Sequence, residues 1–483
     1  MPLILGTNSV KDTGFDVANS CRFNDDDSAY MHKTPGGAGN RRKFTISAWV
    51  KRGQVTTNSF IFSAWTADND AGHFAFGFES AERLTVDTYS TNLLTTTRTF
   101  TDPSAWYHVV CAIDTENDTA NNRVRLYVNG VEETSFATRN NPTEDVDLQA
   151  NNAVIQAVGT NYYNSQGNVF YDGYMAEFCM IDNQQLTPTS FGEFDSDSGI
   201  WKPIDVSGLT FGTNGFYLDF EASGNLGNDA NGGTDLTEVN LAATDQTTDT
   251  CTNNFITLNP LVGVTSQTDN QVYSEGNTII IPNSTDNYGT GFSTIGLKGG
   301  KWYWEAQIVW NGTSNNANFP RTIGFCTENY LFNYSYLGQD EESWGIIFAD
   351  ASTDIWRLEH GGSSDDISGA TTMANGGTMN LALDLDNGKF YVGYNGTFFT
   401  SGDPTSGATG TGAIATLSAT DLSKFLFPAV TNATNSTYYK FNFGNPAYAI
   451  SSGNQDGDGF GNFEYAVPSG YFSINTKNLA EYG

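Results

Sequence analysis

Short stretches in which apolar and polar residues alternate run through the first 195 residues. In KFTISAWVKRG the side chains of Phe44, Ile46, Ala48 and Val50 share one face and Trp49 lies on the other, which predicts a β-strand. Seven further strands of this kind are expected in NSFIFSAW, HFAFGFE, RLTVDTY, WYHVVCAID, VRLYVNGVEE, NAVIQAVG and GYMAEFCMID. Many short strands separated by turn residues predict two packed antiparallel sheets.

A second strand-rich block begins near Asn277. In KWYWEAQIVW, Trp302, Trp304, Ala306 and Ile308 share one face, which predicts a wide, half-buried strand. Other strands are expected in TIIIPN, RTIGFCTEN, ESWGIIFAD, DIWRLEH, KFLFPAVTN and TYYKFNFGN. This block therefore predicts a second sandwich.

Turn residues fix where several strands pair. Asn129-Gly130 lies between VRLYV and VEE, and Asn387-Gly388 lies between two alternating runs, with Asn395-Gly396 following. An Asn-Gly pair between such runs is a hairpin signal, because both central residues of the turn need positive φ. We expect three tight hairpins at these positions.

Composition and charge limit the fold and function classes to which the chain can belong. Gly (51 residues) and 13% aromatic residues favour strands and turns over helices, and 22 basic against 54 acidic residues give a formal charge of 22 − 54 = −32. This excess of acid excludes a default nucleic-acid binder. No run approaches the roughly 20 apolar residues of a membrane span, and MPLILGTNSV has no basic start, so we expect neither a span nor a signal peptide.

The motif order in the first block resembles a known family. FTISAWVKRG, WYHVVCAIDT, VRLYVNGVEE and DGYMAEFCMIDNQQLTP follow one another as the strands of laminin-G-like, concanavalin A-like jelly rolls do, over residues 15–195. The second block, 276–447, is similar to SPRY-type β-sandwiches through GKWYWE, ALDLDNGKFYVGYNGTFF, FPAV and FNFG. The expected fold class is all-β, with two antiparallel β-sandwich domains.

Three other segments complete the expected organisation: an N-terminal arm (1–14), an irregular polar connector (196–275) rich in Asn, Asp, Thr and Gly, and a C-terminal tail segment (448–483). Taken together, the opening, the connector and the tail resemble proteins of tailed, especially marine, phages that join a lectin-like sandwich to a SPRY-like one. That resemblance implies a virion protein, a fibre, spike or head decoration. Its implied partners are other virion proteins, a host-surface glycan or receptor, and further copies of itself in a homo-oligomer.

Catalytic signals are weak. The four histidines show no metal-type spacing, and His108 in WYHVV is expected to be a packed core residue. Asp384 and Asp386 share a face, as a glycosidase pair would, but the SPRY resemblance makes them part of a structural hairpin. We therefore expect no enzyme. Two alternatives remain open: a secreted bacterial glycan-binding protein, which the missing signal argues against, and a glycan-degrading enzyme, which lacks a Glu-x-Asp-x-x-Glu strand.

Binding chemistry can be assigned to loop residues. Aromatic side chains on the loops of a rigid sandwich can stack on a sugar ring while amides and carboxylates bond its hydroxyls; the candidates are Trp65, Tyr162, Tyr163, Trp310 and Tyr334. Calcium is the candidate cofactor because it prefers oxygen ligands on loops, and Asp68 and Asp70 after a strand are the candidate ligands. Cys111 and Cys179 lie in apolar runs and are expected to be free and buried.

Overall fold

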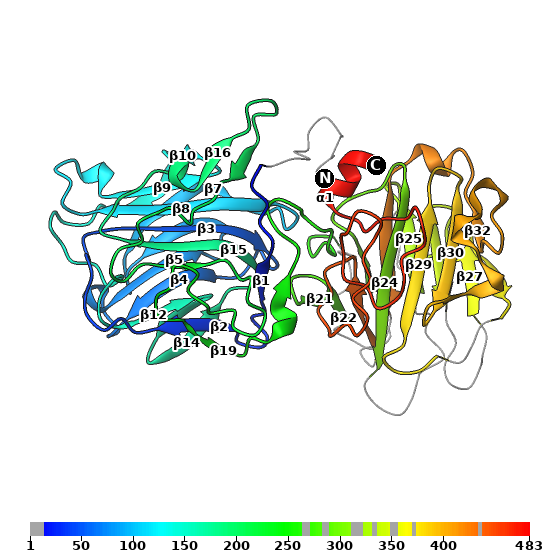
Figure 1. Cartoon of the computed structure of the whole chain (residues 1–483), viewed down its shortest axis with the longest axis horizontal. Coiled ribbons are helices and arrows are strands. Elements are labelled where there is room, and N and C mark those ends of the chain that lie inside the picture. Colours follow the sequence, from blue (N-terminus) through cyan, green and yellow to red (C-terminus); the bar gives the residue numbers. More distant parts are fainter. Residues whose placement is uncertain are drawn as a thin grey trace. The chain divides into compact units, whose positions relative to one another are not determined.

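The chain folds into two compact units, one ending at Asn254 and the other comprising Phe255–Gly483. Figure 1 shows them, coloured from blue to green and from green to red. This computed structural model describes residues 14–262, 271–282, 289–310, 322–330, 336–347, 356–369, 373–432 and 437–483. The expected arm, 1–14, therefore lies almost wholly outside the described residues.

The first unit is a β-sandwich of two antiparallel sheets. Sheet one has the order β10 (Val131–Glu132), β9 (Val124–Val128), β8 (Trp106–Asp114), β3 (Lys43–Arg52), β15 (Gly173–Asp182), β1 (Ser20–Phe23) and β20 (Gln246–Thr247), with β18 (Phe216–Leu218) on β15. Sheet two has the order β11 (Phe136–Arg139), β7 (Asn92–Thr99), β6 (Arg83–Asp87), β5 (His73–Phe78), β4 (Ser59–Trp65), β12 (Ile155–Val158), β2 (Tyr30–Lys33) and β19 (Thr237–Val239). Two separate hairpins are β13 (Thr160–Tyr163) with β14 (Gln166–Phe170) and β16 (Gly192–Phe194) with β17 (Trp201–Pro203).

The second unit is also a pair of antiparallel sheets. One has the order β21 (Gln271–Ser274), β22 (Ile279–Pro282), β34 (Thr437–Asn442), β24 (Lys301–Trp310), β29 (Thr378–Asp384), β30 (Lys389–Tyr394) and β31 (Thr397–Phe398), with β32 (Ala415–Thr416) on β30. The other has the order β23 (Gly289–Phe292), β33 (Leu426–Asn432), β25 (Thr322–Thr327), β26 (Ser343–Ile347), β27 (Trp356–His360) and β28 (Ser363–Ile367).

Helix is scarce in the described residues. The α-helix is α1 (Thr476–Tyr482), and the 3-10 turns are η1 (Asp70–Gly72), η2 (Ala120–Asn122), η3 (Pro188–Ser190), η4 (Ala243–Asp245), η5 (Phe399–Ser401), η6 (Pro404–Thr409) and η7 (Asp421–Ser423). The all-β class with concanavalin A-like and SPRY-like sandwiches is confirmed. No helix in this part of the chain is long and apolar enough to cross a membrane.

Alternation places the cores as expected. Phe44, Ile46, Ala48 and Val50 of β3 are fully buried in an apolar cluster that draws on both sheets of the first unit, and Trp49 on the other face joins a separate cluster. The apolar face of β24 lies in the equivalent core of the second unit. Tyr303 and Glu305 on its other face are also buried, so the prediction of a half-buried strand is wrong there. Period-two patterning thus predicted which side chains fill each sandwich.

Two of the three expected tight turns have the predicted backbone. Asn129 and Gly130 have φ of 47° and 80°, and Asn395 and Gly396 have φ of 47° and 81°. Asn387-Gly388 also joins two paired strands, β29 and β30, but the positive φ is at Gly388 (64°) and not at Asn387. The longer connection lets Asn387 donate its backbone and side-chain N–H groups to Asp384, so that acid is a buried turn residue.

His108 is the packed residue that the sequence predicted. It is 1% exposed, and its ring packs against the rings of Trp49 and Trp201 at centroid distances of 4.9 and 5.9 Å. Trp201 Nε1 donates to His108 Nδ1 (3.1 Å), so the neutral ring presents Nε2–H to Ser47 Oγ at 2.8 Å. Burial lowers the pKa of His108 to about 3, which leaves it no role as a general base near neutrality. All five cysteines are unpaired, and Cys111 and Cys179 are buried as expected.

Residues 196–254, expected to be the larger part of an irregular connector, belong to the first unit. They contribute β17 to a hairpin with β16, and β18, β19 and β20 to the sheets by pairing with β15, β2 and β1. These strands are only two or three residues long, too short for alternation to be read from the sequence. The tail, 448–483, packs within the second unit through α1 and isolated bridges such as Phe255–Asn475.

Candidate functional site

The candidate site lies where β4 ends and β5 begins. Trp65 is the last residue of β4 and His73 the first of β5, and the two are directly opposite each other in the ladder. The core side of these strands is taken by Phe62, Ala64 and Phe74, so alternation turns Trp65 and His73 to the outer face. The loop 66–72 between them carries both predicted aspartates.

Hydrogen bonds hold the Trp65 ring in place. Its Nε1 donates to Asp68 Oδ1 at 2.8 Å, and the same oxygen accepts the backbone N–H of Asn164 at 3.2 Å. The Tyr162 ring lies 6.0 Å from the Trp65 ring, and the Tyr162 backbone N–H donates to Ser63 Oγ at 2.8 Å. The β13–β14 hairpin is therefore tied to β4 beside a half-buried indole.

Asp70 fixes a second loop. Its Oδ1 accepts from the backbone N–H of Ser90 (2.6 Å) and from Thr88 Oγ1 (3.0 Å), and its Oδ2 accepts from Thr91 Oγ1 (2.9 Å). These bonds, led by the Ser90 N–H, lower the pKa of Asp70 below its usual value. The loop that they clamp carries Tyr89, whose side chain is 47% exposed.

His73 connects the two loops. Its ring lies edge-on to Tyr89 at 6.3 Å, and its Nε2 is 2.7 Å from Asn161 Oδ1 at the start of the β13–β14 hairpin. Burial lowers the pKa of His73, so the ring is neutral near pH 7 and donates Nε2–H to the amide oxygen. We call the surface formed by Trp65, Tyr162 and Tyr89 the aromatic patch.

Several polar groups at the aromatic patch have unused hydrogen-bonding capacity within the described part of the chain. Asp68 Oδ2 and the side-chain N–H₂ of Asn161 have no hydrogen-bond partner among the described residues, and the same holds for the side chain of Asn164. Asp68 and Asn164 are also exposed. The aromatic ring faces match the apolar C–H face of a sugar. The free carboxylate oxygen and amides beside them match its hydroxyl groups.

A further carboxyl lies on the same outer face. Asp87 is opposite Ala75, two residues along β5 from His73, and its Oδ1 accepts from Thr85 Oγ1 at 2.6 Å. Burial raises the pKa of Asp87 to about 7. The sequence prediction did not include Asp87, Tyr89 or His73. RLTVDTY reads as one strand, which hides Asp87 and Tyr89, although the run Tyr-Ser-Thr-Asn is a turn signal that could have exposed Tyr89. His73 opens a separate predicted strand, HFAFGFE, and no local pattern marks it as a site residue.

The predicted sugar-binding residues divide between the units. Trp65 and Tyr162 meet at the aromatic patch, and Tyr163 follows in β13 as a half-buried residue opposite Gln166. Trp310 is the last residue of β24 in the second unit, and its side chain is not described. Tyr334 lies outside the described residues. The structure thus brings together two of the five aromatic candidates, Trp65 and Tyr162, with both aspartates in the adjoining loop.

Asp68 and Asp70 do not fit a calcium ion in this geometry. Both oxygens of Asp70 and one of Asp68 already accept hydrogen bonds from protein groups, whereas a calcium ion needs six to eight oxygen ligands. The part of the chain that the structure describes holds no group of three or more His, Cys, Asp or Glu side chains suited to a metal. The two acids instead hold Trp65 and the loop of Tyr89.

The fold and this patch define a β-sandwich protein with an aromatic, polar surface at one loop edge. Residues 25–190 match the family model described as the concanavalin A-like lectin/glucanases superfamily. A search of curated proteins gives no match.

Solved structures give likenesses of fold. The SPRY domain of human HERC1 shares 15% identity over 38% of this chain and 96% of its own, with a TM-score of 0.27. A heptameric SAP-like pentraxin from Limulus polyphemus shares 15% over 36% and 80%, with a TM-score of 0.28. A putative carbohydrate binding protein from Bacteroides ovatus shares 17% over 46% and 58%, with a TM-score of 0.34.

Proposed function

We propose that this protein binds glycans and that the aromatic patch holds the sugar. The observation that carries the proposal is the contact of Trp65 with Tyr162 from a separate segment, with the Trp65 indole fixed by Asp68. Tyr89 from a third segment contacts His73, the residue opposite Trp65 in the β4–β5 ladder. Residues 25–190, which match a model named for lectins and glucanases, include the whole patch.

The arrangement suits a pyranose. The C–H face of the ring stacks on Trp65 or Tyr162, while Asp68 Oδ2 accepts from a hydroxyl and the Asn161 amide donates to another. The bonds from Asp68 and Asp70 set both loops before ligand arrives, so little side-chain and loop entropy is lost on binding.

The test is binding of the whole chain to a glycan array, followed by titration of the best ligand. Trp65→Ala and Tyr162→Ala should each weaken binding about tenfold or more, because each removes a stacking face. Phe194→Ala is the matched control, since Phe194 is a 52% exposed aromatic on β16, outside the patch. Unchanged affinity in both patch variants with intact circular dichroism would refute the proposed site.

We propose binding without hydrolysis. Asp87 has the raised pKa that a general acid needs, but glycoside hydrolysis requires a second carboxylate at a set distance. Asp70, the nearby acid with both oxygens hydrogen-bonded, acts as a loop clamp. Incubation with the bound oligosaccharide should release no reducing sugar; release that disappears in Asp87→Asn would establish an enzyme instead.

We propose further that the protein acts at a virion surface, as a homo-oligomeric fibre, spike or head decoration that attaches to a host glycan. The support is the sequence resemblance to marine tailed-phage proteins, and a glycan-binding patch is consistent with attachment. Immunogold labelling of purified particles should place the protein on them, and light scattering should give a mass above 52.4 kDa. A labelled host-cell envelope with unlabelled particles would favour the secreted bacterial alternative.

A further inference from the structure

We infer that the aromatic patch selects neutral glycans over sulfated or carboxylated ones, and that it does so without calcium. This inference rests on the proposed glycan-binding function and specifies its ligand class. It follows from the charges that surround the ring faces.

Among the residues that the structure describes, the charged groups in contact with the patch are all acids. Asp68, Asp70 and Asp87 meet neutral donors: an indole N–H, backbone N–H groups and hydroxyls. The electrostatic influences on the His73 ring come from Asp68 and Asp70, and the one on Asp87 comes from Glu79. Since the His73 ring is itself neutral, the patch presents uncompensated negative charge.

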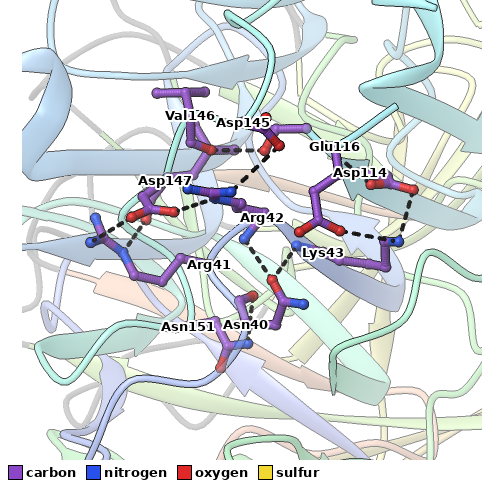
Figure 2. Close-up of polar contacts among 12 residues, drawn as sticks. Asn40, Arg41, Arg42, Lys43, Asp114, Glu116, Asp145, Val146, Asp147 and Asn151 are labelled. Atoms are coloured by element: carbon purple, nitrogen blue, oxygen red, sulfur yellow. Dashed lines mark hydrogen bonds and ion pairs between the residues drawn. The ribbon is translucent and has the colours of Figure 1, made fainter. Parts of the chain in front are cut away.

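The same unit neutralises its acids elsewhere. Figure 2 shows Asp147 between Arg41 and Arg42, with Arg42 Nε at 2.7 Å and Arg41 at 3.8 Å from its oxygens. Lys43 Nζ lies 3.2 Å from Asp114. Bases are therefore available to pair surface acids in this fold, and the aromatic patch lacks them in its described contacts.

The unpaired acids penalise an anionic ligand. A sulfate seated roughly 7 Å from one carboxylate, at an effective dielectric of about 40 to 80, loses about three- to sevenfold in affinity per carboxylate. A neutral sugar escapes this penalty and still meets the same acceptor at Asp68. Because Asp68 and Asp70 are exposed, salt should weaken the discrimination.

Calcium would cancel this discrimination, because a bound dication neutralises two carboxylates. The oxygens of Asp70 are already filled by Ser90, Thr88 and Thr91, so the acids keep their charge and the protein donors replace the cation in ordering the loop. Binding should therefore survive a chelator.

The experiment uses the whole chain and an array that presents each neutral oligosaccharide beside its monosulfated form. The best neutral ligand and its sulfated form are then titrated at about 20 and about 300 mM salt. We expect the neutral form to bind about tenfold tighter at low salt, a smaller gap at high salt, and no change on adding EDTA. Equal or tighter binding of the sulfated form, or loss with EDTA, overturns the inference.

Isosteric variants isolate the charge. Asp68→Asn and Asp87→Asn keep an oxygen that can accept from Trp65 and from Thr85, and at about pH 8, above the Asp87 pKa of about 7, they remove two negative charges. The ratio of neutral to sulfated affinity should fall about tenfold in the double variant. Asp147→Asn in the ion-pair network of Figure 2 is the matched control and should leave the ratio unchanged.

Failure of the inference and failure of the proposed function are distinguishable. Binding that depends on Trp65 but ignores ligand charge removes only the selectivity. Absence of binding to every glycan on the array, or binding that Trp65→Ala and Tyr162→Ala leave intact, removes the proposed site and the inference with it.

Discussion

The two ends of β3 anchor the same strand in opposite ways. At its start, Arg42 and Lys43 form ion pairs with Asp145, Asp147 and Asp114 (Figure 2). The side chain of Asp147 is 49% exposed. At its end, Lys51 and its partner Asp249 are 1% and 0% exposed. The two ends of β3 therefore allow exposed and buried ion pairs to be compared within one sheet.

The buried pair is embedded in further polar contacts. Lys51 Nζ lies 2.7 Å from Asp249 Oδ2 and 2.7 Å from Asn254 Oδ1, and Trp106 Nε1 donates to Asp249 Oδ1 at 3.1 Å. Burial lowers the pKa of Lys51, although Asp249 acts in the opposite direction. Exposed ion pairs contribute about 0–1 kcal/mol, whereas breaking a buried pair strands an unpaired charge and costs about 3–5 kcal/mol. Because its ion pair is buried, loss of a charge at the Lys51 end of β3 should cost more stability than loss of a charge at the Lys43 end.

The largest expected effect is at Lys51. Lys51→Met should destabilise the protein by about 3–5 kcal/mol in urea unfolding, because the Asp249 carboxylate stays buried without its cation. The double variant Lys51→Met with Asp249→Asn removes both charges, keeps an acceptor for Trp106, and should recover most of the loss. A double variant as unstable as the single one would show that packing and not charge decides this end of β3.

The same comparison shows which structural features can be predicted from the sequence. Local alternation was enough to predict the buried face of β3. Residue type and loop position singled out Trp65, Tyr162, Asp68 and Asp70, but their role as ligand-binding residues stays a prediction, and the structure shows the two acids as hydrogen-bond acceptors of neighbouring protein groups. The Lys51–Asp249 pair joins residues 198 apart, and the Asp70–Ser90 bond joins residues 20 apart across a turn hidden in RLTVDTY. Contacts that arise only when strands pair have no local pattern, so the bond between Asp70 and Ser90 required the structure.

A buried acid, Glu177, whose contacts among the described residues include no basic partner, lies beside the middle of β3. Glu177 of β15 is in a bulge opposite β3, with φ of 50°, 6% exposure and a hydrogen bond from Tyr217 OH at 2.6 Å. Burial raises its pKa from 4.5 to about 7. A raised carboxyl pKa gives stability that is full below about pH 4.5 and lost as pH rises through about 7.

The pH dependence is therefore the second expected effect. Between about pH 5 and pH 8, stability should fall by about 2–3 kcal/mol through Glu177, and Glu177→Gln should flatten that slope. Urea unfolding across this range measures it. Glu116→Gln, a 43% exposed acid in the network of Figure 2, is the control and should keep the wild-type profile. A Glu177→Gln profile as steep as wild type would assign the slope to other groups.

The smallest effect should come from the wet end of β3. Lys43→Met removes ion pairs to Asp114 and Glu116 at 3.2 and 3.4 Å from a side chain that is 31% exposed, so the loss should not exceed about 1 kcal/mol. About 0.5 M salt should abolish that loss, because it screens exposed pairs, while the Lys51→Met loss should persist in the same buffer. Urea unfolding of both variants at low and high salt makes the comparison direct. Equal destabilisation by Lys43→Met and Lys51→Met would show that exposure does not decide how much each ion pair contributes to stability. The loss in Lys43→Met would then be assigned to the ordering of loops 114–118 and 143–149 around Arg42.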